Sequence, residues 1–204
     1  MLYAVTALVS YLIGSIPFGV LVGQFAGIDV RRHGSGNIGA TNVLRILGKK
    51  YGIAVFLADA LKGLVAVRLA VWFAGADPFY RNSLGILAAV FVVIGHSFPI
   101  WLRFRGGKGV ATSGGACLGL LPAPALIAGI VWIMVFFAFR YVSVASIAAI
   151  AVLPVVVWVF SDRGNSPDYL MFGFSVFIAV LVIWRHRENI VRLTRGTEPR
   201  FNRK

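Results

Sequence analysis

Charged residues are scarce in this 204-residue chain, at 13% of the total, whereas a typical soluble domain carries about 25%. Acidic residues are the scarcest, since seven Asp and Glu stand against 20 Lys and Arg and give a net charge of +13. So few charges cannot cover a water-facing surface, which excludes an ordinary soluble domain. The one cysteine, Cys117, cannot form an internal disulfide and is expected to be a small buried hydrophobic residue. No basic segment precedes the first apolar stretch, which is also too long for a cleaved signal peptide.

Long stretches without charge take the place of the missing polar surface. A membrane-spanning helix needs roughly 17–25 mostly apolar residues. Charge-free runs cover residues 1–28, 82–102, 109–139, 141–161 and 169–184. Residues 51–76 also qualify, although Asp59, Lys62 and Arg68 interrupt them. These runs predict an all-α integral membrane protein, and the chain length predicts a single domain over residues 1–204.

The distribution of basic residues predicts how the chain crosses the membrane. Residues 109–139 are too many for one ordinary span, and Pro122 and Pro124 divide them into two short helices. Two passes there give seven transmembrane helices, with the N-terminus outside and the C-terminus cytoplasmic. Most Lys and Arg, including Arg140 and the tail that ends at Arg200, Arg203 and Lys204, are then cytoplasmic, while Arg81 and Arg163 lie outside. Five full spans plus a re-entrant hairpin over 109–139 give the same sidedness and remain an alternative.

The positive net charge needs no nucleic-acid partner. It follows from the topology and from attraction to anionic lipid headgroups. Nucleic-acid binding would need a basic face on a soluble fold.

The first of three unusual cytoplasmic segments, residues 31–45, is dense in glycine and small polar residues. It contains a formal G-x-G-x-x-G pattern at Gly34, Gly36 and Gly39, but a membrane helix precedes it, so the dinucleotide-binding interpretation fails. Backbone N–H groups and polar side chains here form a set of donors for an oxyanion or phosphate. The candidate side chains are Ser35, Asn37, Thr41, Asn42 and Arg45. An ordinary interfacial turn is the alternative.

The second segment, residues 95–112, places glycines and a lysine directly before an apolar helix. Gly106, Gly107, Lys108 and Gly109 have the arrangement of an anion site at a helix N-terminus, without the spacing of a Walker A loop. A flexible interfacial hinge is the alternative. His96, one turn or less from the end of its helix, is a structural hydrogen-bonding residue or a substrate ligand.

The third segment, residues 184–198, places His186 and Asn189 on one face if the last helix continues past Trp184. This pair suits proton handling or phosphate positioning, and a basic amphipathic tail on anionic lipid is the alternative. Inside the second span, Asp59 and Lys62 are also three residues apart. An unpaired lysine at the bilayer centre costs roughly 2.5–3.5 kcal/mol, so a structural ion pair is favoured over a proton relay.

At these three segments the chain resembles a family, the bacterial acyl-phosphate:glycerol-3-phosphate acyltransferases called PlsY. The resemblance covers nearly the whole chain and is most specific at residues 34–45, 95–112 and 186–198. It implies transfer of a fatty acyl group from acyl phosphate to the 1-hydroxyl of sn-glycerol 3-phosphate, giving lysophosphatidic acid and inorganic phosphate at the cytoplasmic face of the bacterial inner membrane. No cofactor and no metal are expected.

The same resemblance implies roles for individual residues. Ser35 and Arg45 match essential positions of the first motif, residues 106–109 match a phosphate-binding loop, His186 and Asn189 match a functional pair, and Glu198 matches a structural acid. Either His186 or the substrate's own phosphate takes the proton from the attacking hydroxyl. Ser35 is not favoured as a covalent nucleophile, because no base beside it is evident. A small-anion transporter or channel and a basic scaffold that recruits soluble lipid enzymes are the rival functions.

Overall fold

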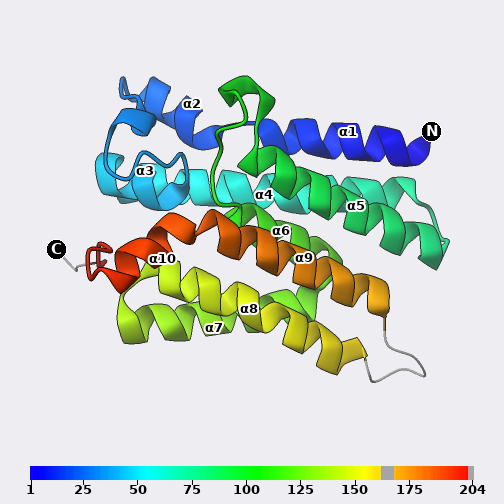
Figure 1. Ribbon diagram of the computed structural model, residues 1–204. Helices are drawn as coiled ribbons and strands as arrows, with labels where there is room; N and C mark the ends of the chain where they lie inside the picture. The colour runs from blue at the N-terminus through cyan, green and yellow to red at the C-terminus, as the bar shows by residue number, and fades with distance from the viewer. Residues whose placement is uncertain (162–167, 202–204) are drawn as a thin grey trace. The chain divides into compact units, whose positions relative to one another are not determined.

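The computed structural model of the protein describes residues 1–161 and 168–201, so that Arg163, Arg203 and Lys204 lie outside the described residues. Every regular element in the described part of the chain is helical (Figure 1), which confirms the predicted all-α class. The helices form two compact units, Met1–Leu120 and Leu121–Lys204. The elements of the first unit are α1 Leu2–Ser15, α2 Phe18–Phe25, the 3₁₀ turn η1 Val30–Arg32, α3 Ala40–Leu47, α4 Lys49–Phe73, α5 Pro78–Ser97, the 3₁₀ turn η2 Ile100–Leu102 and α6 Val110–Leu120.

In the first unit, helices that are far apart in the sequence pack together, since α1 lies along α5 and α4 along α6 (Figure 1). Glycine allows these close approaches. A Cβ atom at Gly63 of α4 would overlap the backbone oxygen of Thr112, and one at Gly115 of α6 would overlap that of Ala60. At the other contact, a Cβ atom at Gly95 would overlap the backbone oxygen of Tyr11. Lipid supplies no hydrophobic force between helices, so close backbone packing of this kind holds them together.

Local sequence signals explain where several of these helices begin and end. The first apolar run is broken between α1 and α2, because the residue before Pro17 avoids the helical conformation, and Ile16 is extended with φ −62° and ψ 115°. Sequence analysis did not predict this break. At the start of α5, Asp77 accepts a hydrogen bond from the backbone nitrogen of Phe79 at 2.8 Å, and Pro78 occupies the first helical position.

The second unit consists of α7 Pro122–Phe139, α8 Val142–Ser161, α9 Tyr169–Arg185 and α10 Arg187–Thr194. A new helix begins at Pro122, directly after α6 ends at Leu120, which confirms the predicted division of residues 109–139. Helix α8 packs against both α7 and α9. The end of the chain folds back on the α7–α8 turn, where Phe201 donates its backbone N–H to the oxygen of Arg140 at 2.8 Å.

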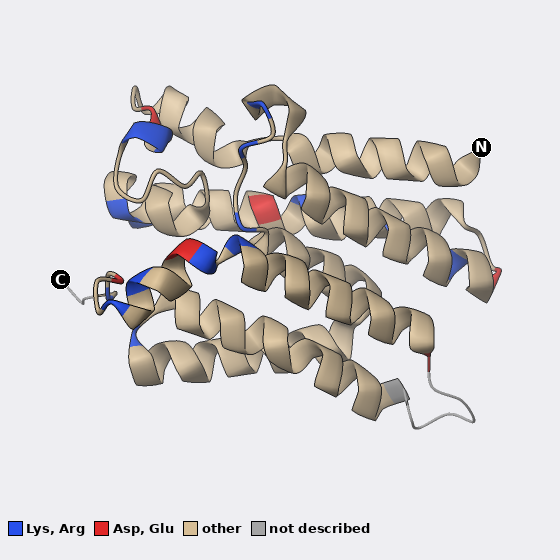
Figure 2. Ribbon diagram, in the orientation of Figure 1, with Lys and Arg blue, Asp and Glu red and all other residues tan. Residues whose placement is uncertain are grey.

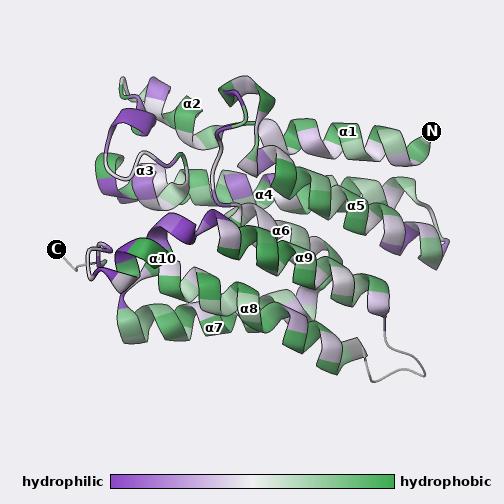
Figure 3. Cartoon of the chain, viewed as in Figure 1, coloured by the Kyte–Doolittle hydropathy of each residue, from purple (hydrophilic) through white to green (hydrophobic). Residues whose placement is uncertain are grey.

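Hydropathy and exposure identify the helices that suit a bilayer. Within the described residues, four stretches are long and apolar enough to cross: Leu2–Phe25, Pro78–Leu102, Pro122–Phe139 and Val142–Phe160. The bent pair α9 and α10 raises the number to five if it counts as one span. Large hydrophobic side chains are exposed along these helices, and Figure 3 shows their green, apolar character. Cys117 is buried in α6, as expected.

Candidate functional site

Asn42 organises the loop of residues 30–42, which joins η1 to α3. Its side chain is buried, with only 2% of its surface exposed. The Oδ1 atom accepts a hydrogen bond from the backbone nitrogen of Ser35 at 2.8 Å. The Nδ2 atom donates to the backbone oxygens of Asn37 at 2.8 Å, Val30 at 3.1 Å and His33 at 3.2 Å. The amide of Asn42 therefore binds the backbone of its own loop and fixes its course.

Two glycines of the first motif are required by this arrangement. Gly34 and Gly36 have φ values of +60° and +69°, in the left-handed region that favours glycine. A Cβ atom at Gly34 would also overlap Oδ1 of Asn42. Asn37 closes the next turn, because its Oδ1 accepts the backbone N–H of Gly39 at 2.9 Å. The glycine pattern thus serves a tight, internally bonded turn.

The polar groups left at the surface of this loop are those suited to an anionic ligand. Ser35 and Arg45 are exposed, and Thr41 is half-buried. Arg45 lies in the last turn of α3, a helix of eight residues. A hydroxyl and a guanidinium held by a fixed turn are hydrogen-bond donors for phosphate oxygens.

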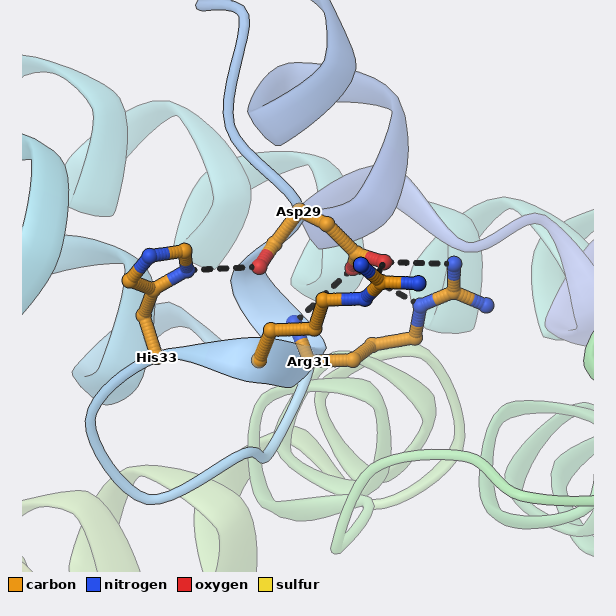
Figure 4. A network of polar contacts seen from close by, with 4 residues as sticks. Asp29, Arg31 and His33 are labelled. Carbon is orange, nitrogen blue, oxygen red and sulfur yellow. Dashed lines mark hydrogen bonds and ion pairs between the residues drawn. The ribbon is translucent and has the colours of Figure 1, made fainter.

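Asp29 ties down the start of the same segment (Figure 4). Its carboxylate accepts three hydrogen bonds from Arg31, from the backbone nitrogen at 3.1 Å and from Nε and Nη2 at 2.8 Å each. The backbone oxygen of Asp29 also lies 3.0 Å from Nδ1 of His33. The hydrogen bonds from Arg31 lower the pKa of Asp29 to about 2. Arg31 is therefore bound directly by the carboxylate. Arg32 is 83% exposed, and its Nε atom lies farther from the carboxylate, 3.7 Å from Oδ2 of Asp29.

The loop of residues 106–109 is fixed to the end of α5. Gly106 donates its N–H to the oxygen of Ser97, and Gly107 to the oxygen of His96, both at 3.1 Å. A Cβ atom at Gly107 would overlap the ring of His96. Gly109 has φ +84° and is buried, while Lys108 is half-buried. Hydrogen bonds thus fix the backbone of this loop directly before α6, and Lys108 lies in the middle of the loop.

A buried polar cluster lies behind this loop in the first unit. Nζ of Lys62 lies 2.8 Å from Oδ1 of Asp59 and donates to the backbone oxygen of Ile16 at 2.9 Å. Nδ1 of His96 lies 3.5 Å from the same carboxylate oxygen. All three side chains are at most 5% exposed. Asp59 and Lys62 therefore form an ion pair within α4, and His96 connects that pair to the backbone of Gly107.

The two glycine loops of the first unit share one apolar support. Val30, Ile38 and Val43, which carry the first loop, form a buried cluster with Val20 and Val55. Leu102, four residues before Gly106, packs against that cluster. Both loops are therefore held by the same group of side chains.

In the second unit, His186 lies at a corner between two helices. Helix α9 ends at Arg185, and α10 continues at an angle of 56°. The helix therefore bends one residue after Trp184 instead of continuing straight through residues 186–189, yet His186 and Asn189 are both buried at the corner. Nδ1 of His186 lies 2.8 Å from the backbone oxygen of Val182. A carbonyl oxygen only accepts, so Nδ1 carries a proton and Nε2 of the neutral ring carries the lone pair.

Glu198 joins the corner to α8. Its Oε1 atom accepts from Nδ2 of Asn189 and from Oγ of Ser143, both at 2.7 Å. Its Oε2 atom accepts from Nε of Arg192 at 2.8 Å. Burial favours the neutral acid, but the hydrogen bonds from Asn189, Ser143 and Arg192 outweigh it and lower the pKa of Glu198. Glu198 therefore holds Asn189 in place as a carboxylate.

The structure brings the predicted residues together as two groups. In the first unit, residues 34–45, 106–109, His96, Asp59 and Lys62 lie on connected elements; in the second, His186, Asn189 and Glu198 form one network. Sequence analysis missed Asp29, Ser143 and Arg192. For Asp29 a signal was available, since an aspartate two residues before an arginine suits a cap. Ser143 carried no signal, because its partner is 55 residues away in the sequence.

The sequence is similar over nearly its whole length to the proteins of one family. Residues 4–196 match the sequence profile of the family described as glycerol-3-phosphate acyltransferase. Among curated relatives, the glycerol-3-phosphate acyltransferase of Agrobacterium fabrum is 44% identical over 204 residues, covering 100% of this chain and 94% of that one. The enzyme of the same name from Desulforamulus reducens is 47% identical over 196 residues, covering 96% of this chain and 93% of that one.

Two solved structures are similar to the whole chain. The crystal structure of PlsY, an integral membrane glycerol 3-phosphate acyltransferase, in its glycerol 3-phosphate form has a TM-score of 0.88 and 40% identity, with 98% of this chain and 96% of that one covered. The lysophosphatidic acid form has a TM-score of 0.86 and 39% identity, with 98% and 95% covered. The similar proteins named here are acyltransferases, which favours an enzyme over a transporter or a scaffold.

Proposed function

Because the chain belongs to the glycerol-3-phosphate acyltransferase family, we propose a specific reaction for it: acyl transfer from acyl phosphate to the 1-hydroxyl of sn-glycerol 3-phosphate. The hydroxyl oxygen attacks the carbonyl carbon, the carbon–oxygen bond to phosphate breaks, and phosphate leaves with the electron pair. The hydroxyl proton passes to a base. The products are lysophosphatidic acid and inorganic phosphate. Acyl phosphate has a good leaving group, so catalysis needs chiefly positioning and stabilisation of the developing oxyanion.

The observation that carries this proposal is the Asn42-bonded loop. It holds Ser35 on a turn that cannot easily change shape, directly before helix α3, which carries Thr41 and Arg45. We assign Ser35, Thr41 and Arg45 to the oxygens of a phosphate-bearing substrate. Asn37 and Asn42 shape the loop from behind, so Asn42 supports the site without touching substrate.

The second loop is assigned to the other phosphate. Lys108 supplies the charge, and the fixed backbone of Gly106 and Gly107 holds that lysine at the start of α6. His96 with Asp59 and Lys62 is assigned to hold that backbone. The buried ion pair supports this structural role, because both of its charges have partners.

His186 is one of two candidate bases. The proton on Nδ1 faces the carbonyl of Val182, so Nε2 is the ring atom that would accept the proton of the substrate hydroxyl. The other candidate is the phosphate of the substrate. Asn189, held by Glu198, is assigned to orient substrate oxygens.

We further propose seven transmembrane passes with the N-terminus outside and the site at the cytoplasmic face of the bacterial inner membrane. Five of the seven passes are the apolar stretches described above. The other two are α4, with its buried ion pair, and α6. Helix α6 has 11 residues and rises about 16 Å, so it needs flanking residues to cross. Both units serve one acyltransferase domain. Single cysteines placed in a Cys117→Ser chain and labelled from each side of a vesicle test the sidedness.

Phosphate release by the purified protein in detergent, with acyl phosphate and glycerol 3-phosphate, tests the reaction. Release must depend on both substrates; release without glycerol 3-phosphate would indicate simple hydrolysis, and no release would refute the proposal. Arg45→Gln and Lys108→Gln are expected to raise KM. His186→Ala separates the two bases, because nearly intact turnover at saturating substrate would assign the proton to the substrate phosphate.

A further inference from the structure

The turn between α5 and the 106–109 loop exposes apolar and basic side chains together. Ile100, Trp101 and Phe104 are 47%, 63% and 57% exposed, and Arg103 and Arg105 are exposed beside them. We call residues 100–105 the 100–105 tip. In Figure 1 it projects beyond α1 and α5, and Figure 2 marks basic residues along it. Three large hydrophobic groups at one turn form a patch that marks an interaction site.

The backbone of the tip is strained and is held by hydrogen bonds. Arg103 and Phe104 both have positive φ, at 52° and 62°, although neither is glycine. Such conformations persist only where the surroundings impose them. Here hydrogen bonds impose them: the nitrogens of Leu102 and Phe104 both donate to the oxygen of Pro99, at 3.1 and 3.0 Å. In this strained conformation Trp101 and Phe104 are exposed, while Leu102 packs against the buried cluster.

The positive charge of the tip has no acidic counterpart nearby in the sequence, which contains no Asp or Glu between Asp77 and Asp162. Within the described residues, no ion pair joins Arg103 or Arg105 to a carboxylate. These exposed guanidinium groups can therefore form charge-assisted hydrogen bonds with an anion from outside the chain.

The position of the tip indicates where that anion is. Residues 78–102 form one of the apolar stretches that suit a membrane span, and the tip lies at its end. Tryptophan is enriched at membrane–water interfaces, and arginine near an anionic surface is attracted to its phosphates. We propose that the 100–105 tip is a built-in binding surface for anionic phospholipid, with Trp101 and Phe104 among the headgroups and Arg103 and Arg105 on their phosphates.

This surface is connected to the 106–109 loop. Arg105 is followed directly by Gly106 and Gly107, whose N–H groups are bonded to the end of α5. Lipid bound at the tip thus holds one end of that loop against the membrane boundary. The inference concerns lipid binding and does not depend on the reaction that the site performs.

Quenching of tryptophan fluorescence by brominated lipid tests the proposal in the absence of both substrates. The full-length protein is placed in phosphatidylcholine vesicles that contain a minor fraction of either brominated phosphatidylglycerol or brominated phosphatidylcholine. The difference between wild type and Trp101→Phe isolates the signal of Trp101 among five tryptophans. Each arginine near an anionic surface contributes a factor of about 5 to local lipid enrichment, so brominated phosphatidylglycerol is expected to quench Trp101 more strongly.

The variant Arg103→Gln/Arg105→Gln should remove this preference, whereas Arg81→Gln should not, because Arg81 lies in the first turn of α5, at the opposite end of the same apolar stretch. Equal quenching by both lipids in the wild type would overturn the proposal without requiring any variant to fold. No quenching by either lipid would show that Trp101 faces water or another protein, and this outcome would also overturn the proposal. Phosphate release in detergent should be unchanged in the double variant; its loss would assign the arginines to substrate instead of bilayer lipid.

Discussion

The contact between Gly107 and His96 gives the sharpest prediction for the 106–109 loop. Alanine at position 107 would place its Cβ atom in the ring of His96, and the φ value of Gly107 is not in the left-handed region. The main obstacle to the substitution is therefore the ring of His96. Overpacking of this kind costs about 1–3 kcal/mol, which corresponds to a loss of about 5- to 150-fold in kcat/KM if the strain is relieved by moving the loop.

A double-mutant cycle with His96→Ala tests that reasoning. Removing the ring removes the overlap, so Gly107→Ala should cost nothing further in the His96→Ala protein. The coupling energy should then equal the cost of Gly107→Ala alone, well above the ~0.5 kcal/mol scatter of independent sites. Initial rates of phosphate release with both substrates varied, and thermal unfolding in detergent, measure it.

Gly109→Ala is the matched control for the cycle. Gly109 has φ +84°, which strains any residue with a Cβ atom whatever its neighbours are. The decrease in kcat/KM caused by Gly109→Ala should therefore persist in the His96→Ala background. If Gly107→Ala and His96→Ala are additive, or if His96→Ala rescues Gly109→Ala equally well, the steric explanation is wrong.

Three further predictions concern the supports of the site. Asn42→Ala leaves four loop groups without their partner and should lower kcat/KM by about 30-fold or more, at roughly 0.5–1.5 kcal/mol for each hydrogen bond, while Asn82→Ala on exposed α5 surface should not. Gly63→Ala forces α4 away from Thr112 and should lower the unfolding temperature by several degrees, whereas Gly114→Ala, whose Cβ meets open space, should be tolerated. Because the pKa of Glu198 is lowered, its stabilisation is present above the ordinary value of 4.5 and is lost as pH falls through the folded value. Glu198→Gln should therefore cost about 2 kcal/mol at pH 7 and little in acid, and equal costs at both pH values in thermal unfolding would contradict the carboxylate role.

Much of the helix pattern could be predicted, because the absence of charge and the position of Pro122 act over short distances. The break at Pro17 was equally visible but was overlooked, since the charge-free run around it suggested one helix. The 56° corner at His186 has no comparable signal, because tertiary contacts of Glu198 and Ser143 hold it. Long-range pairing of α1 with α5 and α4 with α6 also lies beyond any local pattern.

For the candidate site, composition singled out three segments but did not indicate how the individual polar side chains in them are bonded. A glycine-rich polar loop suggested that each polar side chain might serve as a donor to substrate. The burial of Asn42 instead directs its amide into the loop. Spacing alone suggested the ion pair of Asp59 and Lys62, because an i,i+3 interval on a helix fixes both side chains on one face. Its link to His96 crosses between helices and required the fold.

The pairing of α1 with α5 has a consequence for biosynthesis. The face of α1 that packs in the protein carries Thr6, Ser10, Gly14 and Ser15, which are poor partners for hydrocarbon. Its complement, α5, is made only after the ribosome has passed residue 97. During synthesis, α1 must therefore remain beside an insertase or loosely packed in lipid until α5 has emerged from the ribosome.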